Sequence, residues 1–365
     1  MQPYLTKEYA NPSSVYRFSQ RVLKAVCDAR SIVAQSIGAK EDEIIFTSGG
    51  TESNNLAIKG VAFCDKSKGK HIITSKIEHH SVLNPCKFFE GRGFGLTYLN
   101  VDSGGSIDLE QLEKSIKKET VLVSIMHANN ETGTIQPIEK IAKICKEKGV
   151  LFHTDAIQTA GKIPLDINIG IDMLSLSAHK FYGPKGIGAL YIRKGVGLCP
   201  LLHGGHQERD MRPGTENVSG IIGLGKALAM ANSSMKKTQK EITKLRERLA
   251  KGLKKIEGVK VNGHLKNSLY NTLNVSIEGV EAASLLVKLD LEGICVSAGS
   301  SCQSSSLEAS HVLLAMGLSQ ALAKASIRIS LGKYNTEKEI DKALSILIKA
   351  VLALRKISTF KITKL

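Results

Sequence analysis

Short apolar runs separated by helix-like stretches dominate the first half of the chain. The runs lie at 44–47, 71–74, 121–124, 151–154, 173–176 and 188–191. Apolar runs of this length that alternate with helical segments are typical of buried strands in a sheet covered by helices on both faces. The pattern therefore predicts an α/β fold with a mostly parallel central sheet.

Two helices carry clear boundary signals. One is expected from Pro137 to Gly149, because proline suits a first helical turn and glycine suits a helix end. The last helix is expected to begin after Thr336, which forms a capping box with Glu339. Each has an apolar face, made by Ile138, Ile141, Ala142 and Cys145 in the first and by Ile340, Leu344, Leu347 and Val351 in the second. The first helix would cross over between two parallel strands.

A long helical segment at 216–257 separates two parts of the chain. After it, strand-like segments near 272–277 and 326–331 alternate with helices in a different rhythm. We therefore expect a large domain at 1–236 and a smaller C-terminal α/β domain at 237–365.

The chain is strongly basic, with a net charge of +16 and an isoelectric point near 9.4. Its lysines are spread along helices such as 235–255 and 336–356, which favours a solvated face over a nucleic-acid site. No apolar run approaches the roughly 20 residues of a membrane span, and the first residues lack the pattern of a secretion signal. The sequence predicts a cytoplasmic protein that does not enter a membrane.

The 7 cysteines are scattered along the chain. An odd number without a short repeated spacing is a poor disulfide framework. No pair has the Cys-x-x-Cys spacing that would supply two zinc ligands, so no metal site is expected.

Two polar residues follow predicted strands. Lys180 comes shortly after the run at 173–176, and Asp155 directly follows the run at 151–154. Ligands of open α/β sheets bind at the carboxyl ends of the strands. There, Lys180 would suit a Schiff-base lysine, and Asp155 would keep the ring nitrogen of a pyridoxal cofactor protonated. Taken alone, each has a plainer interpretation, as a surface lysine and as a helix cap.

The segment 47–52, Thr-Ser-Gly-Gly-Thr-Glu, joins a strand to a helix expected at 51–63. Free amides and the dipole at a helix start favour a bound phosphate, although such turns also occur without a ligand. On the strand-like segment at 326–331, Arg328 would suit the carboxylate of an amino acid, or else be an exposed arginine. His79 would stack on a planar ring or move protons, or else be a strand-end histidine without such a role.

Cys302 lies in a stretch rich in serine and glycine at 297–306. A nucleophilic thiol that enters a pocket and then presents its product outside needs a loop of this kind. Judged alone, a cysteine of this kind is usually a loop cysteine without a function.

Taken together and in order, these motifs resemble the cysteine desulfurases of the class V aminotransferase superfamily, in particular the NifS- and IscS-like group. The resemblance extends from Asn11 to about Arg355. It rests on the segments at 11–14, 46–55, 78–79, 127–133, 155–158, 177–180, 214–217 and 299–302. Each segment is weak by itself, whereas the ordered set is specific.

The resemblance implies a pyridoxal 5'-phosphate enzyme of fold type I and assigns roles to individual residues. Lys180 matches the Schiff-base lysine, Asp155 the partner of the ring nitrogen, and His79 the stacking acid–base residue. Arg328 matches the arginine that binds the substrate carboxylate, and Cys302 the cysteine that carries the persulfide. Contacts to the region of the ring hydroxyl are implied for Gln158 and Asn130, and contacts to the phosphate for Gly50, Thr51, Ser177 and His179.

A threonine matching Thr215 reaches the phosphate across a subunit boundary in this family, which implies a homodimer. The implied activity converts L-cysteine to L-alanine and passes the sulfur to an iron–sulfur scaffold protein or to tRNA-thiolation factors. The alternatives are a selenocysteine lyase, an aminotransferase, or a non-catalytic assembly partner. The family's usual opening strand is absent before Met1, and we expect that this weakens substrate positioning.

Overall fold

The computed structural model describes residues 1–64, 69–298 and 308–357. By its internal contacts the chain forms two compact units. The first comprises 1–99, 109–127 and 137–235, and the second comprises 100–108, 128–136 and 236–365. The segments 100–108 and 128–136, which the sequence analysis placed in the large domain, thus group with the second unit. The division at 236/237 itself stays a prediction.

The first unit is built on a seven-stranded sheet in the order β1-β7-β6-β5-β4-β2-β3. Its strands are β1 (Ile44–Thr47), β2 (His71–Ser75), β3 (Gly95–Leu99), β4 (Thr120–Ser124), β5 (Leu151–Asp155), β6 (Met173–Ser177) and β7 (Gly188–Ile192). Neighbouring strands are parallel, except that β7 is antiparallel to both β1 and β6. The predicted α/β fold with a mostly parallel sheet is therefore confirmed.

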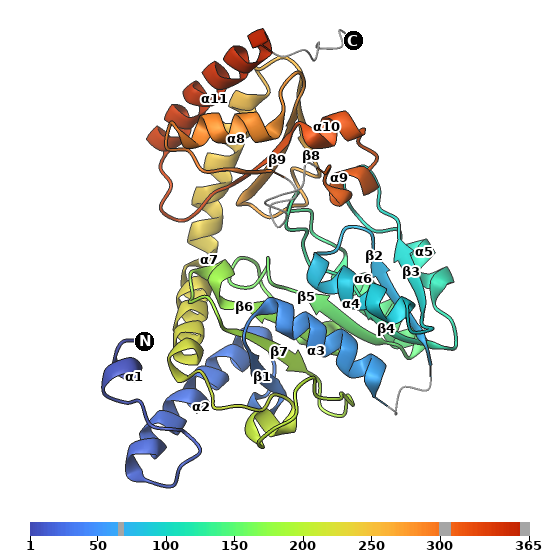
Figure 1. Ribbon diagram of the computed structural model, residues 1–365, viewed down its shortest axis with the longest axis vertical. Coiled ribbons are helices and arrows are strands. Elements are labelled where there is room, and N and C mark those ends of the chain that lie inside the picture. The colour runs from blue at the N-terminus through green and yellow to red at the C-terminus, as the bar shows by residue number, and fades with distance from the viewer. Residues whose placement is uncertain (65–68, 299–307, 358–365) are drawn as a thin grey trace. The chain divides into compact units, whose positions relative to one another are not determined.

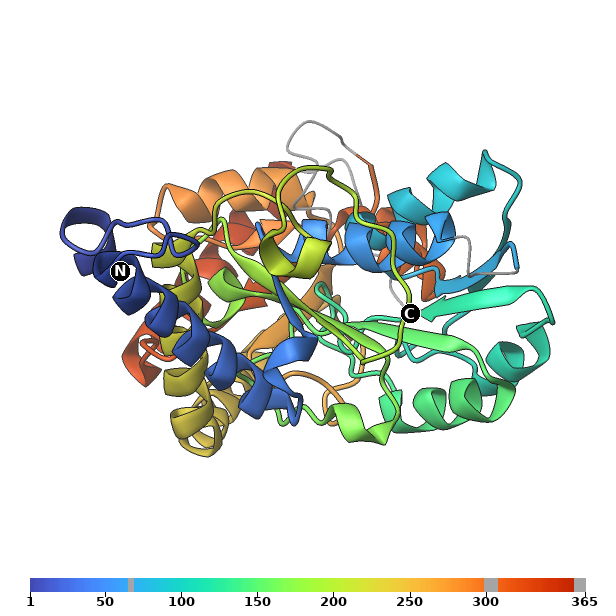
Figure 2. The same cartoon turned by 90° about the horizontal axis from the view of Figure 1, so that it is seen from below.

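Helices cover both faces of this sheet, with α3 and α4 on one side and α2, α5 and α6 on the other (Figures 1 and 2). The helices of the unit are α1 (Pro3–Thr6), α2 (Arg17–Ile37), α3 (Gly50–Phe63), α4 (His80–Glu90), α5 (Leu109–Ser115), α6 (Ile138–Lys148) and the first half of α7 (Val218–Leu253). Short 3₁₀ turns lie at η1 (Glu41–Glu43), η2 (Ile167–Ile169), η3 (Ala178–Phe181) and η4 (Gln207–Asp210). Because both faces are covered, every residue of β1, β2 and β6 is buried.

The expected boundary of the crossover helix is confirmed. Helix α6 has Pro137 as its N-cap and ends at Gly149, which adopts a left-handed φ of 67° and receives the last turn without steric cost. The edge strand β3 was not predicted. Only Leu99 of its residues is buried, so the segment lacks the apolar signal of the interior strands.

The second unit contains a four-stranded antiparallel sheet in the order β10-β11-β9-β8. Its strands are β8 (Val259–Asn262), β9 (Thr272–Ile277), β10 (Ser297–Ala298) and β11 (Ser326–Ser330), and its helices are α8 (Ala282–Asp290), α9 (His311–Ala315), α10 (Gln320–Lys324) and α11 (Glu337–Ile357). The capping box before α11 is present, since the Thr336 N–H donates to Glu339 Oε2 at 2.8 Å. Strands β9 and β11 and helix α11 enclose an apolar core that includes Val275, Ile327, Leu347 and Val351.

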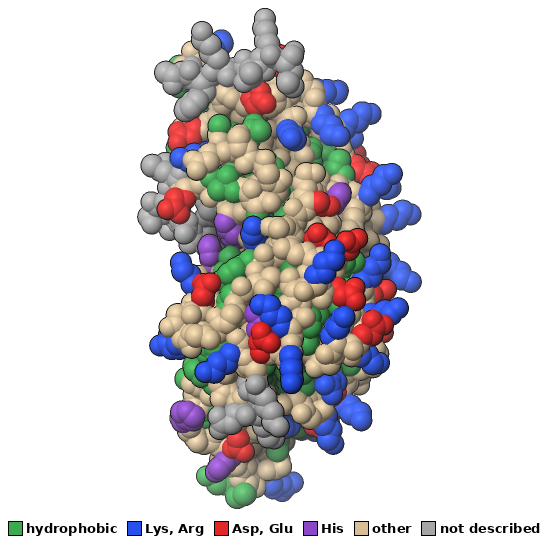
Figure 3. Space-filling view, turned by 90° about the vertical axis from the view of Figure 1, so that its right-hand side faces the viewer, with side chains coloured by type: hydrophobic (Ala, Val, Ile, Leu, Met, Phe, Trp, Pro, Cys, Tyr) green, Lys and Arg blue, Asp and Glu red, His purple; other side chains and the backbone are tan. Residues whose placement is uncertain are grey.

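Lysine and arginine side chains are spread over the face in Figure 3, and acidic side chains lie among them. Among the residues that the structure describes, no helix combines the length and apolar character needed to cross a bilayer.

Candidate active site

The carboxyl ends of β5 and β6 and the start of α3 come together in the first unit. Gly50, at the start of α3, lies so close to the turn after β5 that a side chain there would collide with Ile157. A Cβ at the same position would also lie 3.4 Å from the Cβ of Ser177. The preceding Gly49 has a φ of 155°, which side chains disfavour. Contact with the Ile157 side chain thus favours glycine at position 50, and the backbone conformation favours glycine at position 49.

This junction gathers the residues expected to bind phosphate. The start of α3, at Gly50 and Thr51, offers backbone amides and the positive end of a helix dipole. The hydroxyl of Ser177, the last residue of β6, lies 3.0 Å from Nδ1 of His179. Gly50, Ser177 and His179 therefore lie side by side, with Thr51 one residue further along α3.

Asp155 ends β5 and is almost completely buried. Its Oδ1 accepts the Ile157 N–H at 2.9 Å, and its Oδ2 accepts Nδ2 of Asn54 at 2.7 Å. Burial raises the pKa of Asp155, against the lowering effect of these hydrogen bonds and of the Lys180 charge. The turn after Asp155 does not begin a helix, so the interpretation of Asp155 as a helix cap is wrong. A buried carboxylate of this kind suits a cationic partner.

Lys180 lies in η3, directly after β6, and its side chain is exposed. Its charge acts on two site residues: it opposes the burial that raises the pKa of Asp155, and it adds to the burial that lowers the pKa of His79. The turn is tight, because Tyr182 adopts a left-handed φ of 67° and the Gly183 N–H returns to the Ala178 carbonyl at 2.9 Å. The lysine is therefore held at the same sheet edge as Asp155.

His79 is the N-cap residue of α4. Its Nδ1 accepts the Ser81 N–H at 3.1 Å and lies 2.8 Å from the Ser81 hydroxyl. Burial lowers the pKa of His79, and the charges of His80 and Lys180 lower it further. The imidazole is therefore neutral at neutral pH.

Gln158 is half-buried in the turn after β5. Its carbonyl accepts Nζ of Lys162 at 2.7 Å. Burial lowers the pKa of Lys162 to about 7, and Lys180 contributes to the shift. The lysine thus braces the backbone that presents Asp155 and Gln158.

Two expected substrate-binding residues lie together in the second unit. Nη1 of Arg328, on β11, donates to the carbonyl oxygen of Asn130 at 2.8 Å. The adjacent Glu131 accepts the Ser310 hydroxyl at 2.5 Å. Burial raises the pKa of Glu131 to about 7, against the lowering effects of the Ser310 hydrogen bond and the Arg328 charge. These contacts hold the backbone at Asn130, which accepts the Arg328 hydrogen bond.

Two expected site residues are not placed at these clusters. Cys302 lies outside the described residues. Thr215 is exposed on the loop that precedes α7. Within the described ranges, no group of three or more His, Cys, Asp or Glu side chains is arranged to hold a metal ion.

The structure adds residues to which the sequence analysis gave no role. Asn54 and Ser81 link Asp155 to His79, and Glu78 accepts the Met126 N–H at 3.0 Å with both carboxylate oxygens. Asn54 and Glu78 stand within the segments that carried the family resemblance, which was the only available signal. For Lys162 and Ser81, the sequence contained no signal of a role in the site.

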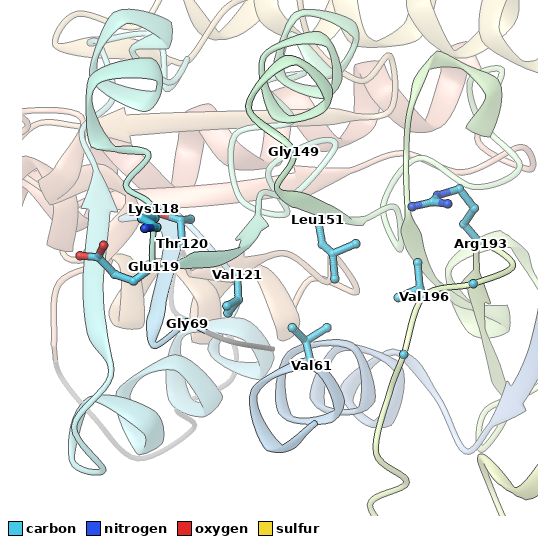
Figure 4. A pocket seen from close by; sticks show the side chains of 12 residues that line it. Val61, Gly69, Lys118, Glu119, Thr120, Val121, Gly149, Leu151, Arg193 and Val196 are labelled. Carbon is cyan, nitrogen blue, oxygen red and sulfur yellow. The ribbon is translucent and has the colours of Figure 1, made fainter. Parts of the chain in front are cut away.

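The first unit contains two cavities, and only one of them lies next to the expected site residues. One of about 380 Å³ is lined by Thr51, His79 and Ser81 among others, next to the residues described above. The other, of about 560 Å³, lies at the opposite edge of the sheet, where Thr120 and Leu151 begin β4 and β5 (Figure 4). None of the expected site residues lines this second cavity.

Comparison with known proteins gives consistent relatives. The family model described as aminotransferase class V matches residues 1–343. A protein named cysteine desulfurase IscS from Dictyoglomus turgidum is 53% identical over 363 residues, which cover 99% of this chain and 92% of that protein. A protein of the same name from Methanosarcina thermophila is 51% identical over 359 residues, covering 98% of this chain and 89% of that protein.

Solved structures agree with these sequence relatives. A NifS-like protein superposes with a TM-score of 0.91 at 42% identity, covering 96% of this chain and 94% of the other. A structure described as SspA in complex with cysteine gives a TM-score of 0.81 at 41% identity, covering 92% of this chain and 94% of the other. The chain therefore belongs to the class V aminotransferase family, in the group whose members are named cysteine desulfurases.

Proposed function

We propose that this chain is a pyridoxal-phosphate-dependent cysteine desulfurase, which converts L-cysteine to L-alanine and collects the sulfur on Cys302. One observation carries the proposal most directly. The buried Asp155 carboxylate lies at the carboxyl edge of the sheet, where the positive charge of Lys180 acts on it. The chain that carries this pair is about half identical to proteins named cysteine desulfurase. These relatives favour the desulfurase over the lyase, the aminotransferase and the non-catalytic partner.

The residues present fit pyridoxal phosphate. The glycine start of α3 leaves space and amide donors, and Ser177 and His179 add polar groups, so that Gly50, Thr51, Ser177 and His179 would hold the phosphate. Asp155 would hold the protonated ring nitrogen, and Gln158 and Asn130 would contact the ring hydroxyl region. His79 would lie over the ring, and Lys180 would bind the cofactor covalently. When bound, this cofactor withdraws electrons from the α-carbon of an attached amino acid.

The chain's own groups divide the remaining work. Arg328 binds the substrate carboxylate through paired hydrogen bonds, and the Asn130 carbonyl orients its guanidinium. With the cofactor bound, the Lys180 amine would be the base that takes the α-proton of the substrate. Asp155 would pair with the ring nitrogen of the bound cofactor, and the Asn54 and Ile157 hydrogen bonds favour its charged form against the burial that raises its pKa.

The sulfur step belongs to Cys302. Its thiolate attacks the sulfur of the substrate, and a sulfur–sulfur bond forms as the carbon–sulfur bond breaks. The electron pair of the broken bond stays with the carbon skeleton, which takes up protons and leaves as alanine. An external thiol or an acceptor protein then removes the sulfur from the persulfide.

The proposal includes partners. Thr215 would hold the phosphate bound by a second copy in a homodimer, and its exposure on a loop leaves it accessible to such a copy. The sulfur acceptor is an iron–sulfur scaffold protein or a tRNA-thiolation factor. A cytoplasmic location stays a prediction from the sequence.

The decisive experiment is to measure alanine and sulfide released from L-cysteine by the loaded protein with added thiol. We expect equal amounts of both, and a persulfide on the protein when the thiol is omitted. Cys302→Ser should keep the visible band of the lysine-bound cofactor and form no persulfide, because a hydroxyl does not accept sulfur. Alanine release at the parent rate in this variant would favour the lyase, and a keto acid product would favour the aminotransferase.

A further inference from the structure

The loop at 206–211 docks against the edge strand of the seven-stranded sheet. Strand β1 is the last strand of that sheet, so one side of its backbone needs partners other than a strand. The carboxylate of Glu208 accepts the Phe46 N–H at 2.8 Å. Arg209 donates to the Ile44 carbonyl at 3.0 Å. The loop is therefore fixed to β1 by its own side chains.

The backbone of this loop has an unusual conformation that a buried ion pair holds in place. Glu208, Arg209 and Asp210 have left-handed φ angles of 44°, 57° and 64°, a conformation that costs free energy for any residue with a side chain. Both carboxylate oxygens of Glu208 accept from the guanidinium of Arg30, at 2.8 and 2.6 Å. Paired bonds of this kind fix direction as well as distance. The loop thus enters the next segment from a defined position.

The next segment, residues 212–217, is called the arm below, and it carries Thr215. Nε of Arg212 donates to Oε1 of Glu52 at 3.0 Å, and the two side chains are only 26% and 18% exposed. The other oxygen of Glu52 accepts the Ser48 N–H at 2.7 Å. Glu52 lies in the first turn of α3, where the amides expected to bind phosphate begin. One ion pair therefore joins the arm to the phosphate site of its own chain.

Two further bonds hold the arm on either side of Thr215. Before it, the Gly214 N–H donates to Oε1 of Gln207 at 2.9 Å. After it, Nδ2 of Asn217 donates to the Gly186 carbonyl at 3.3 Å. Thr215 itself is exposed between these anchors. The arm is therefore held in place on its own chain, while its threonine is accessible to another molecule.

We infer that Arg212 and Glu52 form a positioning pair, which holds the arm so that Thr215 completes the phosphate site of a second copy of this chain. The inference rests on the proposed function, in which Thr215 has that role. Arg212 is three residues from Thr215, and the intervening Pro213 has a fixed φ, so a shift at Arg212 also moves Thr215. A group that is held in its binding position loses less freedom on binding and binds more tightly.

A direct attraction between Arg212 and the phosphate is the competing explanation. Burial raises the pKa of Glu52, but the hydrogen bonds from Ser48 and Arg212 lower it by more, so the pair is ionised at neutral pH. Removing the arginine charge would then weaken phosphate binding, whereas removing the glutamate charge would strengthen it. Loss of positioning would weaken binding in both variants. The two substitutions therefore separate the explanations.

Mixed dimers test which site the pair acts on. Two copies with different tags are co-expressed, and dimers with one copy of each are purified. One copy carries Lys180→Ala, so the visible band of the lysine-bound cofactor reports only on the site of the other copy. Pyridoxal phosphate is titrated into the apoprotein. With Arg212→Gln added to the Lys180→Ala copy, the reporting site should lose about tenfold in apparent affinity, and with Thr215→Ala there it should lose about tenfold to a hundredfold.

The reverse arrangement is the matched control. Arg212→Gln is placed in the copy that keeps Lys180, and the other copy carries Lys180→Ala alone. The reporting site then receives an undisturbed arm, and its affinity should stay near the parent value. An equal or larger loss in this arrangement would show that the pair acts on its own chain's site, and it would overturn the inference.

Two more variants are placed in the Lys180→Ala copy. Glu52→Gln should weaken the reporting site severalfold, and tighter binding would instead reveal a pure charge effect and overturn the inference. Arg212→Gln combined with Thr215→Ala should lose no more affinity than Thr215→Ala alone, because both changes remove the same contact. Additive losses would overturn the inference.

The parent protein keeps the inference and the proposed function apart. A parent without the visible band, or one that is a monomer, would contradict the proposed function itself. A parent dimer that shows the band, together with an Arg212→Gln copy that leaves the reporting site unchanged, would contradict only the positioning role.

Discussion

The two edges of the seven-stranded sheet use buried polar residues in different ways. At the amino edge, both ring nitrogens of His71 bond to the neighbouring strands, Nδ1 to Thr120 at 2.7 Å and Nε2 to Thr97 at 2.9 Å. At the carboxyl edge, the chain of bonds from Asp155 passes through α3 and ends on α4 at His79. Bonds between adjacent strands stabilise the sheet itself, whereas bonds between a strand end and two helices would, under the proposed function, position side chains for the cofactor.

The pKa shifts of buried groups also differ between the two edges. Burial raises the pKa of Glu78, at the carboxyl edge, to about 8, and it also raises that of Asp155. Burial lowers the pKa of His71 at the amino edge, where both ring nitrogens already have strand partners. Shifted carboxyl groups near a lysine are typical of a catalytic site, and the fully bonded histidine is typical of a structural one.

The largest expected effect is that of Lys180→Ala at the carboxyl edge. Without the amine no covalent link to the cofactor forms and no base removes the α-proton, so activity should fall by about a thousandfold or more. Absorption spectra should lack the visible band of the lysine-bound cofactor, although phosphate contacts still retain some free cofactor. An unchanged band would show that the lysine is misassigned.

Asp155→Asn is expected to act next most strongly. The neutral amide no longer stabilises a proton on the ring nitrogen, so kcat should fall by roughly a hundredfold while the cofactor still binds. Titration of the apoprotein with pyridoxal phosphate separates the two effects. A parent-like kcat together with weakened cofactor binding would assign Asp155 a purely structural role.

A smaller effect is expected from pH through Glu78. Because its folded pKa is raised to about 8 from 4.5, this carboxyl stabilises the fold fully below pH 4.5, and the contribution is lost as pH rises toward 8. Glu78→Gln removes this titration, so the apoprotein's melting temperature should vary less with pH over that window. Parallel curves for parent and variant would contradict the raised pKa.

The smallest effect is expected at the amino edge. Thr120→Val removes the hydroxyl partner of His71 Nδ1 and should lower the free energy of unfolding by about 1 kcal/mol. Denaturant titration measures this loss, and kcat/KM should remain at the parent value. A changed kcat/KM would mean that the two edges are coupled, which would end the distinction drawn between them.

The pattern of apolar and polar residues along the chain predicts most strands of the first unit and the residues that end them. Runs such as 173–176 are largely apolar because helices cover both faces of the sheet, so their burial can be predicted from the local sequence. Asp155 and Lys180 were therefore placed at the sheet edge, and the predicted α/β fold was confirmed. The weaker strands β3 and β8 (Val259–Asn262) went unpredicted because few of their residues are buried.

The hydrogen bonds that connect these residues depend on how distant segments pack in the folded chain. Asn54 and Asp155 are 101 positions apart in the sequence, and Asn54 and Ser81 are 27 positions apart. No local sequence pattern therefore predicts the hydrogen bonds between them. The same holds for segment 128–136, which groups with the second unit through contacts to distant strands. Periodicity encodes whether a side chain is buried, but the order of the strands and the packing of the helices decide which group it meets.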